Sequence, residues 1–336
     1  MAGIKDICKM TGLSVATVSR VFNDSSLVSD KTKTKVLEAA KELNYRHNRI
    51  AAALRSGKSM TIGVIVPEIN NHFFGNVIKG IEEKLGQNGY SAIITQSHES
   101  SSIERNAIDS LMKLKIDGIL ISCSKETTDF SIFQSIEKEG VPVVFFDRKP
   151  TLEEANLVLL DDFEGGQIAT QHLIDKGCMS LVHIAGDAKV SIFNDRKNGF
   201  LNKVEWHCGK IKMHQCIELS FELNKDIKIL KNLLQDHPEI DGIFCHGDKY
   251  CVHTMDVLRI LGYSVGKDIK LIGFGNNDYT EFTHPKISSI DQKCNEMGTL
   301  AAEILLDNLE KETMLHTKQV LRPVLVERDS TNTTFI

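Results

Sequence analysis

From Thr61 onward, short apolar runs alternate with longer stretches that have the periodicity of amphipathic helices. The runs read TIGVIV, SAIIT, GILIS, VPVVFF, LVHIA, DGIFC and KLIGF, and the helix-like stretches include residues 74–87, 164–176 and 250–261. Apolar strands that alternate with such helices form parallel sheets covered by helices on both faces. Residues 61–336 are too many for one sheet of ordinary size. We therefore expect an α/β body of two doubly wound parallel-sheet lobes.

Charge divides the chain at about the same place. Residues 1–58 carry a net charge of +6 and the remaining residues carry −11, within an overall charge of −5. A basic segment ahead of an acidic body indicates that only the first segment meets a polyanion such as DNA. Because most charged runs are simply solvated surface, the charge alone does not decide the partner.

Three short helices are expected in the basic segment. The first covers Ile4–Met10 and ends at Gly12, which suits a left-handed turn. The second covers Val15–Asn23 after Ser14 as its N-cap, and Ser29 caps the third, which extends to about Leu43. The apolar side chains expected to face inward are Ile4, Ile7, Cys8, Val18, Val21, Phe22, Val36, Leu37, Ala40 and Leu43. Two helices joined by a glycine-containing turn form a helix-turn-helix.

The outer face of the second helix suits the reading of DNA. The small side chains at its start, Val15 and Ala16, let the backbone enter a major groove and touch thymine methyl groups. Arg20 suits a bidentate contact to guanine, and Thr17 and Ser19 suit phosphate contacts. On spacing alone, a three-helix bundle used for protein contacts is the alternative.

The segments IKDICKMTGLSVATVSRVFN and VSDKTKTKVLEAAKELNYRHN resemble the DNA-binding head of the LacI/GalR family of bacterial repressors. The resemblance continues through TIGVIVPEINNHFF and, more thinly, to the C-terminus. It implies a helix-turn-helix head at residues 1–46, a hinge helix and linker at 47–60, and a periplasmic-binding-protein-like body for effector binding and dimerisation at 61–336. The DNA-contacting residues that it implies are Ser14, Val15, Ala16, Thr17, Ser19, Arg20, Asn23, Tyr45, Asn48, Ala51 and Leu54.

The resemblance also implies that the chain passes between the two lobes three times, near Asp161, Ile290 and Leu321. The expected segments are 61–160 and 291–321 in lobe one, and 162–289 and 322–336 in lobe two. A last strand around Gln319–Val326 would close the assembly.

In the family, the segment that matches NRIAAALRSG, Asn48–Gly57, is a hinge helix that orders on the operator and pairs with its dimer mate. Isolated helices of this length are marginal in water, and Leu54 matches the apolar wedge that kinks the minor groove. An ordinary linker is the alternative. His47 stands where the family commonly has proline, which makes the entry to the hinge less rigid, and Ala52 stands where it often has arginine.

Polar and aromatic side chains at the carboxyl ends of the expected strands form the candidate effector site. Arg196, expected on the first turn of a helix, presents several fixed donors, and Asp147 presents an acceptor from the opposite lobe. Aromatic faces such as that of Phe221 suit a sugar or nucleobase ring. The alternative is that strand-end residues only cap the next helix and that Phe74 is mostly core. The expected set is Phe73, Phe74, Gln96, Asp147, Arg196, Phe221, Asp248, Asn276 and Gln292.

The family motif after the late strand is usually G-[FY]-D, whose aspartate binds ligand hydroxyls or a purine. This chain reads GFGNNDY, with Gly275 in that place and Asn276 or Asn277 as candidate substitutes. We expect a carbohydrate effector, with a purine or another metabolite as the alternative. His72 for a frequent proline and Cys178 for the usual histidine are further departures that the sequence does not explain.

Other function classes lack their sequence signatures. No G-x-G-x-x-G follows a strand, and there is no P-loop lysine motif or G-x-S-x-G elbow, so a doubly wound enzyme is not expected. A sugar-transport binding protein would need a signal peptide, which the polar start MAGIKDICKM does not provide. With no apolar run of transmembrane length, the expected location is cytoplasmic, without membrane contact.

The eight cysteines include no C-x-x-C pair and the twelve histidines no paired ligand spacing, so we expect reduced thiols and neither metal nor cofactor. The expected partners are double-stranded operator DNA, a small-molecule effector and a second copy of the chain. The C-terminal RDSTNTTFI carries no leucine heptad of the kind that pairs dimers in some family members, so a dimer is expected rather than a tetramer. Together these features predict a ligand-controlled transcriptional repressor.

Overall fold

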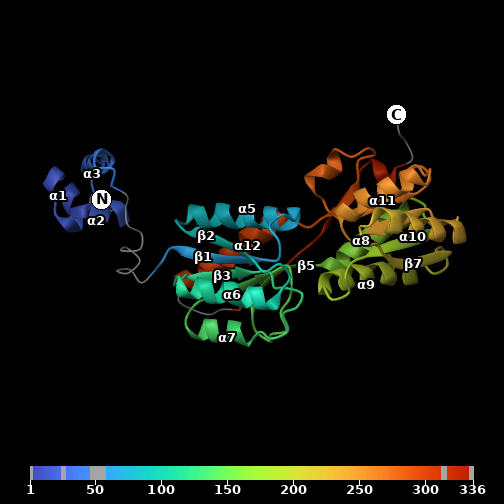
Figure 1. The fold of residues 1–336 in the computed structure, drawn as a ribbon, viewed down its shortest axis with the longest axis horizontal. Coiled ribbons are helices and arrows are strands. Elements are labelled where there is room, and N and C mark those ends of the chain that lie inside the picture. The colour runs from blue at the N-terminus through green and yellow to red at the C-terminus, as the bar shows by residue number, and fades with distance from the viewer. Residues whose placement is uncertain (1–2, 24–27, 46–57, 312–315, 333–336) are drawn as a thin grey trace. The chain divides into compact units, whose positions relative to one another are not determined.

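The computed structural model describes residues 3–23, 28–45, 58–311 and 316–332. The chain divides into two compact units, Met1–Met60 and Thr61–Ile336. The described part of the first unit is helical, and the second unit contains two sheets with helices on their faces (Figure 1).

The first unit packs three helices around a small core. They are α1 (Ile4–Thr11), α2 (Val15–Asn23) and α3 (Asp30–Glu42). Gly12 ends α1 with a φ of 70°, a left-handed conformation that glycine adopts without steric cost. Ser14 Oγ accepts the backbone N–H of Thr17 at 3.1 Å and so caps α2, as the sequence predicts. The buried side chains are Ile7, Val18, Val21, Val36, Ala39 and Ala40.

One core position in this bundle was predicted wrongly. Leu37, expected inside, is 53% exposed, and Ala39 is buried instead. The inward stripe of α3 runs through Val36, Ala39, Ala40 and Leu43, which are spaced by three or four residues. Leu37 follows Val36 by a rotation of about 100° and therefore points away from the stripe.

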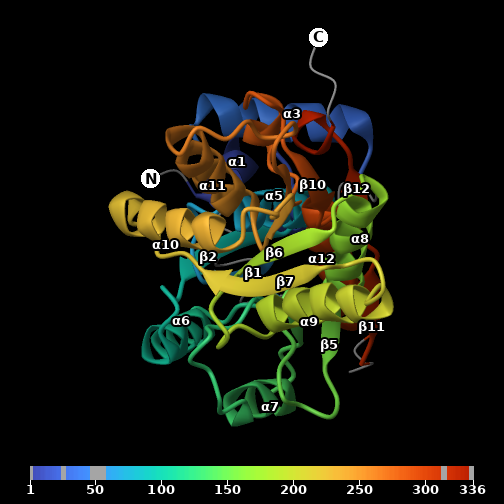
Figure 2. The ribbon, with the colours of Figure 1, turned by 90° about the vertical axis from the view of Figure 1, so that its right-hand side faces the viewer.

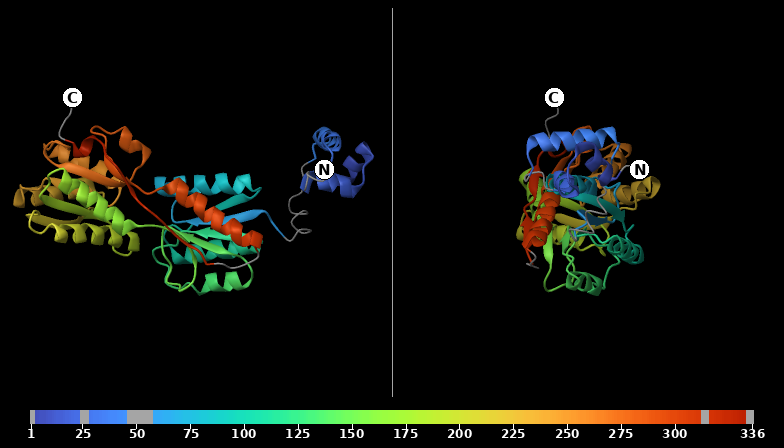
Figure 3. Two further views of the ribbon diagram at one scale, coloured as in Figure 1. Left: turned by 180° about the vertical axis from the view of Figure 1, so that it is seen from behind. Right: turned by 90° about the vertical axis from the view of Figure 1, so that its left-hand side faces the viewer.

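The sheet of lobe one has six parallel strands in the order β11-β5-β4-β3-β1-β2. Its strands are β1 (Thr61–Val66), β2 (Ser91–Gln96), β3 (Gly118–Ile121), β4 (Val143–Phe146), β5 (Asn156–Leu160) and β11 (Lys318–Leu321), and its helices are α5 (His72–Gln87), α6 (Ser101–Lys113), α7 (Ser131–Lys138) and α12 (Cys294–Lys311). Alternate strand residues pack on opposite faces: Val64 joins the core with α5 and α12, whereas Ile65 joins the core with α6 and α7. Figure 3 shows α12, in red-orange, along this sheet from behind.

The sheet of lobe two has the order β12-β10-β9-β8-β6-β7 and is parallel except for β12, which pairs antiparallel with β10. Its strands are β6 (Ser180–Ala185), β7 (Met213–Glu218), β8 (Gly242–Cys245), β9 (Lys270–Gly275), β10 (Ser288–Asp291) and β12 (Val324–Val326), and its helices are α8 (Asp162–Asp175), α9 (Ser191–Trp206), α10 (Leu223–Asp236) and α11 (Asp248–Ile260), with short 3-10 turns η2 (Asp278–Glu281) and η3 (Asp329–Thr331). Figure 2 shows β6 and β7 between α10 and α11 on one side and α8 and α9 on the other.

The chain passes from the first sheet to the second after β5, returns after β10, and passes again after β11. The single last strand expected around Gln319–Val326 is in fact two strands in different sheets. Arg322 and Pro323 separate them. Because Pro323 has no N–H to donate, it interrupts the ladder of hydrogen bonds at this position.

Two glycines bring α8 and α9 into close contact. A Cβ atom on Gly166 would overlap the carbonyl oxygen of Arg196, and one on Gly199 would overlap the carbonyl oxygen of Phe163. Only glycine permits backbones to approach this closely. The contact places the backbone of Arg196 directly against α8.

Candidate functional site

A cavity of about 1060 Å³ opens between the carboxyl ends of the two sheets. Of the nine side chains expected to bind an effector, seven line its wall: Phe73, Phe74, Asp147, Arg196, Phe221, Asp248 and Gln292. Lobe one contributes the start of α5 and the residues after β4, and lobe two contributes α9, β9 and the start of α11. The two doubly wound lobes thus bring strand-end residues together, as parallel sheets do in general.

Gln96 and Asn276, the other two expected residues, do not line this wall. Gln96 Oε1 instead accepts the backbone N–H of Ile69 at 2.9 Å. The side chain of Asn276 is held between lobe-two partners, since its Nδ2 donates to Asp291 at 3.2 Å and its Oδ1 accepts from Arg328 at 2.8 Å. The neighbouring Asn277 lines the cavity in its place.

Arg196 lies at the bottom of the cavity and is only 3% exposed. Its Nε donates to Asp162 Oδ1 at 2.7 Å, and its Nη1 donates to the carbonyl of His246 at 2.6 Å. Nη2 lies 3.4 Å from Gln292 Oε1, and the guanidinium carbon lies 3.7 Å from the ring centroid of Phe274. Within the described residues these bonds take three of its five N–H groups.

The expectation that Arg196 lies on the first turn of its helix was wrong. α9 begins at Ser191, so Arg196 lies on the second turn. Its partner Asp162 is 4% exposed, and this burial raises the pKa of Asp162 to about 7 although the positive charge of Arg196 opposes the shift. Arg196 and Asp162 therefore form a buried ion pair, and removal of either residue would leave the other buried without its partner.

Asp147 faces the cavity from lobe one with a φ of 67°. Its Oδ2 accepts the Ser122 hydroxyl at 3.1 Å and lies 3.7 Å from Arg148 Nε. Burial raises the pKa of Asp147, against the opposing charges of Arg148 and Arg196. Arg148 is itself anchored by two parallel bonds to Glu99, at 2.8 and 2.7 Å. This network fixes an acceptor opposite Arg196.

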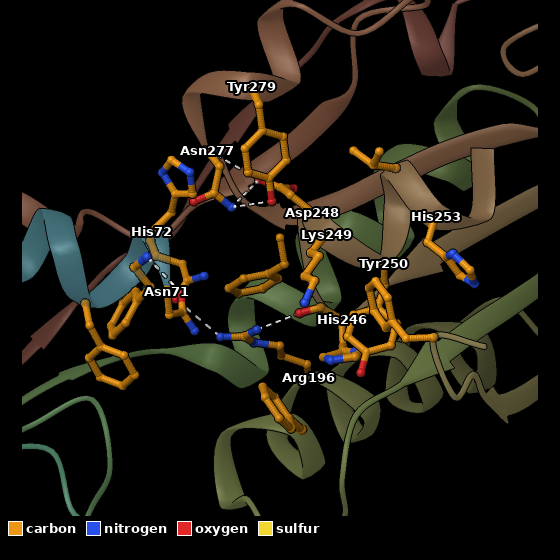
Figure 4. Close-up of a pocket in the computed structure, with 18 of the residues that line it drawn as sticks. Asn71, His72, Arg196, His246, Asp248, Lys249, Tyr250, His253, Asn277 and Tyr279 are labelled. Atoms are coloured by element: carbon orange, nitrogen blue, oxygen red, sulfur yellow. Dashed lines mark hydrogen bonds between the residues drawn. The ribbon is translucent and has the colours of Figure 1, made fainter. Parts of the chain in front are cut away.

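Asp248, the first residue of α11, is 1% exposed and lies beside Asn277 (Figure 4). Its Oδ1 accepts the Ser289 hydroxyl at 2.6 Å. Its Oδ2 accepts the backbone N–H of Asn277 at 2.8 Å and the Asn277 amide at 3.1 Å. Burial raises the pKa of Asp248, and these three hydrogen bonds oppose the shift.

Two aromatic rings of the cavity wall, Phe221 and Phe274, are covered by the protein's own side chains. Phe221 stacks on His253 at 4.9 Å with an interplanar angle of 22°, and Lys249 Nζ lies 4.5 Å from the centroid of the same ring. The guanidinium of Arg196 covers Phe274. The open aromatic face that the sequence suggests at Phe221 is therefore occupied.

Sequence reasoning missed several wall residues: Phe193, His246, Lys249, Tyr250 and His253. His246 directly follows β8, so the strand-end rule that selected Asp248 also applies to it. Burial lowers the pKa of His246 to about 3, which keeps its ring neutral. The others lie on α9 or α11, and no strand end marks them.

In the first unit, the start of α2 presents Ser14, Val15, Ala16 and Arg20 to solvent, with Val15 45% exposed. Thr17 and Ser19 are half-buried, and Tyr45 packs on Phe22 with ring centroids 5.5 Å apart. The expected contacts outside the described residues are the side chain of Asn23, and Asn48, Ala51 and Leu54, together with the departures His47 and Ala52.

Within the described ranges, no group of three or more histidine, cysteine, aspartate or glutamate side chains is arranged to hold a metal ion. No helix of that same part of the chain has the length and apolar character needed to cross a membrane.

Cys178, which stands where the family usually has histidine, is buried. Its Sγ lies 3.3 Å from the carbonyl oxygen of Asp241, which gives this departure a packing role.

Comparison with known proteins identifies both units. Residues 3–48 match the family model "Bacterial regulatory proteins, lacI family", and residues 170–331 match "Periplasmic binding protein-like domain". The ribose operon repressor of Halalkalibacterium halodurans is 29% identical over 331 residues, which cover 98% of this chain and 97% of that protein. The HTH-type transcriptional repressor PurR of Vibrio vulnificus is 30% identical over 335 residues, which cover 98% of each.

Among solved structures, a LacI family transcriptional regulator from Enterococcus faecium with bound ribose superposes with a TM-score of 0.71. It is 26% identical in sequence, and the match covers 82% of this chain and 100% of that one. The curated relatives are transcriptional repressors rather than enzymes. The chain belongs to the LacI family of bacterial transcriptional regulators, with a DNA-binding helix-turn-helix head and a periplasmic-binding-protein-like effector body.

Proposed function

We propose that this regulator is a homodimeric repressor that binds a near-palindromic operator and is controlled by a carbohydrate held between its two lobes. For the operator, the support is the outward face of α2, where Val15, Ala16 and Arg20 are exposed while Val18 and Val21 are buried. A recognition helix needs such a face to reach base edges in the major groove. Two heads related by a twofold axis would read two half-sites.

The observation that carries the carbohydrate proposal is that charged side chains from both lobes line one cavity. Asp147 in lobe one and Arg196 and Asp248 in lobe two bring carboxylate and guanidinium groups to the same space. Sugar hydroxyls both donate and accept, so they suit such a mixed set. The rings of Phe221 and Phe274 are covered by Lys249, His253 and Arg196, which leaves little open surface on them for a planar base.

Relatives support the same class of ligand. The Halalkalibacterium halodurans relative is named a ribose operon repressor, and the Enterococcus faecium regulator contains ribose. A purine is the second candidate, because the PurR relatives are equally similar in sequence. Stacking of a purine on Phe221 would require Lys249 to leave the face of that ring.

A thermal-shift screen of the full chain tests the proposal. The probes are D-ribose, cellobiose, D-ribose 5-phosphate, hypoxanthine and guanine. A ligand at about 100 times its Kd stabilises the folded state by about 2.7 kcal/mol, which raises the Tm measurably. We expect a sugar to give the largest shift. A shift with hypoxanthine or guanine and none with any sugar would reject the carbohydrate and favour the purine.

Effector binding would act on the operator through linkage. A ligand that contacts Asp147 in lobe one and Arg196 in lobe two binds one relative angle of the lobes better than another. The free energy by which it favours that angle is the most that it can transmit to operator binding. Operator affinity measured with and without saturating sugar gives this coupling directly.

A further inference from the structure

Glu99 holds two separate parts of lobe one on one carboxylate. Its Oε1 and Oε2 accept Arg148 Nη2 and Nη1 at 2.7 and 2.8 Å, and Oε2 also accepts the backbone N–H of Lys125 at 2.8 Å. Arg148 lines the cavity, whereas Lys125 belongs to the segment after β3, residues 122–127. Arg148 Nη1 also donates to the carbonyl oxygen of Cys123 in that segment, at 2.8 Å. The Glu99–Arg148 pair therefore joins the cavity wall to the segment after β3.

Unusual backbone conformations place both members of this pair. His98 and Glu99 have φ angles of 50° and 59°, so two consecutive residues other than glycine are left-handed. Asp147, directly before Arg148, has a φ of 67°. Residues with a Cβ atom avoid this region, and they stay in it only where the surrounding contacts hold them. Strain of this kind beside both ends of one ion pair indicates a role for the pair beyond stability.

The side chain of Lys125 extends the connection into lobe two. Its Nζ donates to Asp187 Oδ2 at 2.8 Å. Asp187 lies in the turn that precedes α9, and α9 carries Arg196. A chain of hydrogen bonds thus runs from Arg148 on the wall of lobe one, through Glu99 and Lys125, to the turn before α9 in lobe two.

Arg148 still has a donor to satisfy. Its Nε is buried and makes no hydrogen bond within the part of the chain that the structure describes. Asp147 Oδ2, which also belongs to a wall residue, lies 3.7 Å away and is too distant for a hydrogen bond. A buried donor without a partner costs free energy, so a small shift of Asp147 towards Nε is favourable. A ligand that contacts Asp147 or Arg148 therefore acts on a pair that is poised to move.

We infer that Glu99 is the positioning residue that couples the effector cavity to the Lys125–Asp187 bridge between the lobes. Glu99 does not line the cavity, so it acts through Arg148 and through the backbone of Lys125. A ligand that moves Arg148 moves the carboxylate that holds Lys125, and so changes the strength of the bridge. By linkage, the intact bridge favours the arrangement of Arg148 that the ligand binds. The inference rests on the proposed binding of a carbohydrate between the lobes.

Hydrogen exchange of the full chain without ligand tests the connection. The reporter is the turn before α9, where the backbone N–H groups of Lys189 and Val190 donate to Asp187 at 3.0 and 2.9 Å. In Glu99→Gln one acceptor oxygen becomes an N–H donor, so the side chain no longer holds both of its partners. We expect a peptide covering residues 186–190 to exchange about threefold faster or more in Glu99→Gln, and by a similar factor in Lys125→Met.

Glu104→Gln is the matched control. The Glu104 carboxylate also holds the segment after β3, since it accepts the Ser124 N–H and the Thr127 hydroxyl, each at 2.6 Å. These bonds do not run through the Glu99–Arg148 pair. We therefore expect Glu104→Gln to leave exchange at residues 186–190 as in wild type, although it loosens the same segment.

Calorimetry with D-ribose at two salt concentrations tests the coupling to the ligand. D-ribose carries no charge, so salt acts on its binding mainly through charges of the protein, such as the exposed Lys125–Asp187 bridge. We expect wild-type affinity to fall about two- to fivefold between about 0.02 M and about 0.5 M NaCl. Glu99→Gln, Lys125→Met and the double variant should all show the weaker affinity at low salt and lose the salt dependence. Glu104→Gln should keep it.

Three results overturn the inference. They are wild-type exchange at residues 186–190 in Glu99→Gln, an equal rise of exchange in Glu104→Gln, and affinity losses of Glu99→Gln and Lys125→Met that multiply in the double variant. If D-ribose and the other sugars fail to bind wild type, the carbohydrate proposal is rejected, while the exchange of residues 186–190 still decides whether Glu99 is connected to lobe two.

Discussion

Lys125 and Asp187 join the two lobes by a salt bridge: Lys125 Nζ in the segment after β3 donates to Asp187 Oδ2 in the segment after β6 at 2.8 Å. The side chains are 33% and 42% exposed, so solvent screens the pair. Its contribution to the free energy of unfolding should be below about 1 kcal/mol. We expect the pair to matter for the relative angle of the lobes, because it holds the two lobes together across the space between them.

Lys125→Met should therefore alter effector binding more than stability. Without the bridge the lobes separate more readily, and closing them around a sugar becomes less favourable. We expect D-ribose affinity to fall about two- to fivefold, by calorimetry in low salt. Lys84→Met is the matched control, because Lys84 pairs with Glu303 within lobe one at 2.6 Å. Unchanged affinity in Lys125→Met, or an equal fall in Lys84→Met, would show that the Lys125–Asp187 bridge does not affect effector binding.

Arg196→Ala should destabilise the body as well as weaken effector binding. Removal of the guanidinium leaves Asp162 buried without its partner, which costs about 3–5 kcal/mol of unfolding free energy. Urea unfolding at pH 7.5 measures this loss. Addition of Asp162→Asn should recover part of it, since the amide carries no charge. If Arg196→Ala unfolds at the same urea concentration as wild type, the buried pair is not as the structure has it.

Local sequence rules were sufficient for the helices of the first unit and for part of the cavity wall. The N-cap at Ser14, the turn at Gly12 and the positions of Asp147 and Asp248 after strands all follow from local rules. These rules work because they concern neighbours in the chain. The presence of Arg196 on the wall was likewise expected, although the helix turn that carries it was not.

Contacts between distant segments could not be predicted in this way. Gln96 looks like a wall residue until its bond to Ile69 is known, and Phe221 looks open until Lys249 and His253 are seen to cover it. The pairing of Asp248 with Gly275 joins the start of one helix to the end of a strand 27 residues later. Side-chain packing decides such cases, and single-residue patterns carry no signal for it.

The stability of the body should fall in acid because of His183. The ring is fully buried between Phe200 and Phe244, and burial lowers its pKa to about 3, although the hydrogen bond that Nδ1 donates to the Phe244 carbonyl oxygen opposes the shift. An unfolded histidine has a pKa of about 6.5. Below pH 6.5 the unfolded state therefore binds the extra proton, and unfolding becomes easier as the pH falls towards 3.

The size of this effect is about 1.4 kcal/mol per pH unit for one such histidine. Other groups titrate in the same range, so the comparison is between wild type and His183→Asn. We expect the free energy of unfolding, measured by urea between pH 6 and 4.5, to depend less steeply on pH in the variant by about that amount. Parallel pH profiles for the two proteins would mean that His183 is protonated in the folded state.

The proposed dimer predicts a molecular mass of two chains in light scattering at micromolar protein, with or without DNA. A twofold operator needs two heads, and no more than two are required. A mass of four chains would contradict the prediction, and a mass of one chain that doubles only on operator DNA would place dimerisation on the DNA instead.

Arg20→Ala should reduce the preference for operator over random DNA. Arg20 is exposed on α2, beyond the small side chains of Val15 and Ala16, where a guanidinium can form two parallel bonds to guanine. We expect specific binding to weaken by about 1–3 kcal/mol in a titration at fixed salt, while binding to random DNA changes much less. Lys41→Ala, an exposed basic residue at the end of α3, is the control and should affect both DNAs alike. Equal losses on operator and random DNA for Arg20→Ala would mean that Arg20 contacts only phosphate and that α2 reads the operator through other residues.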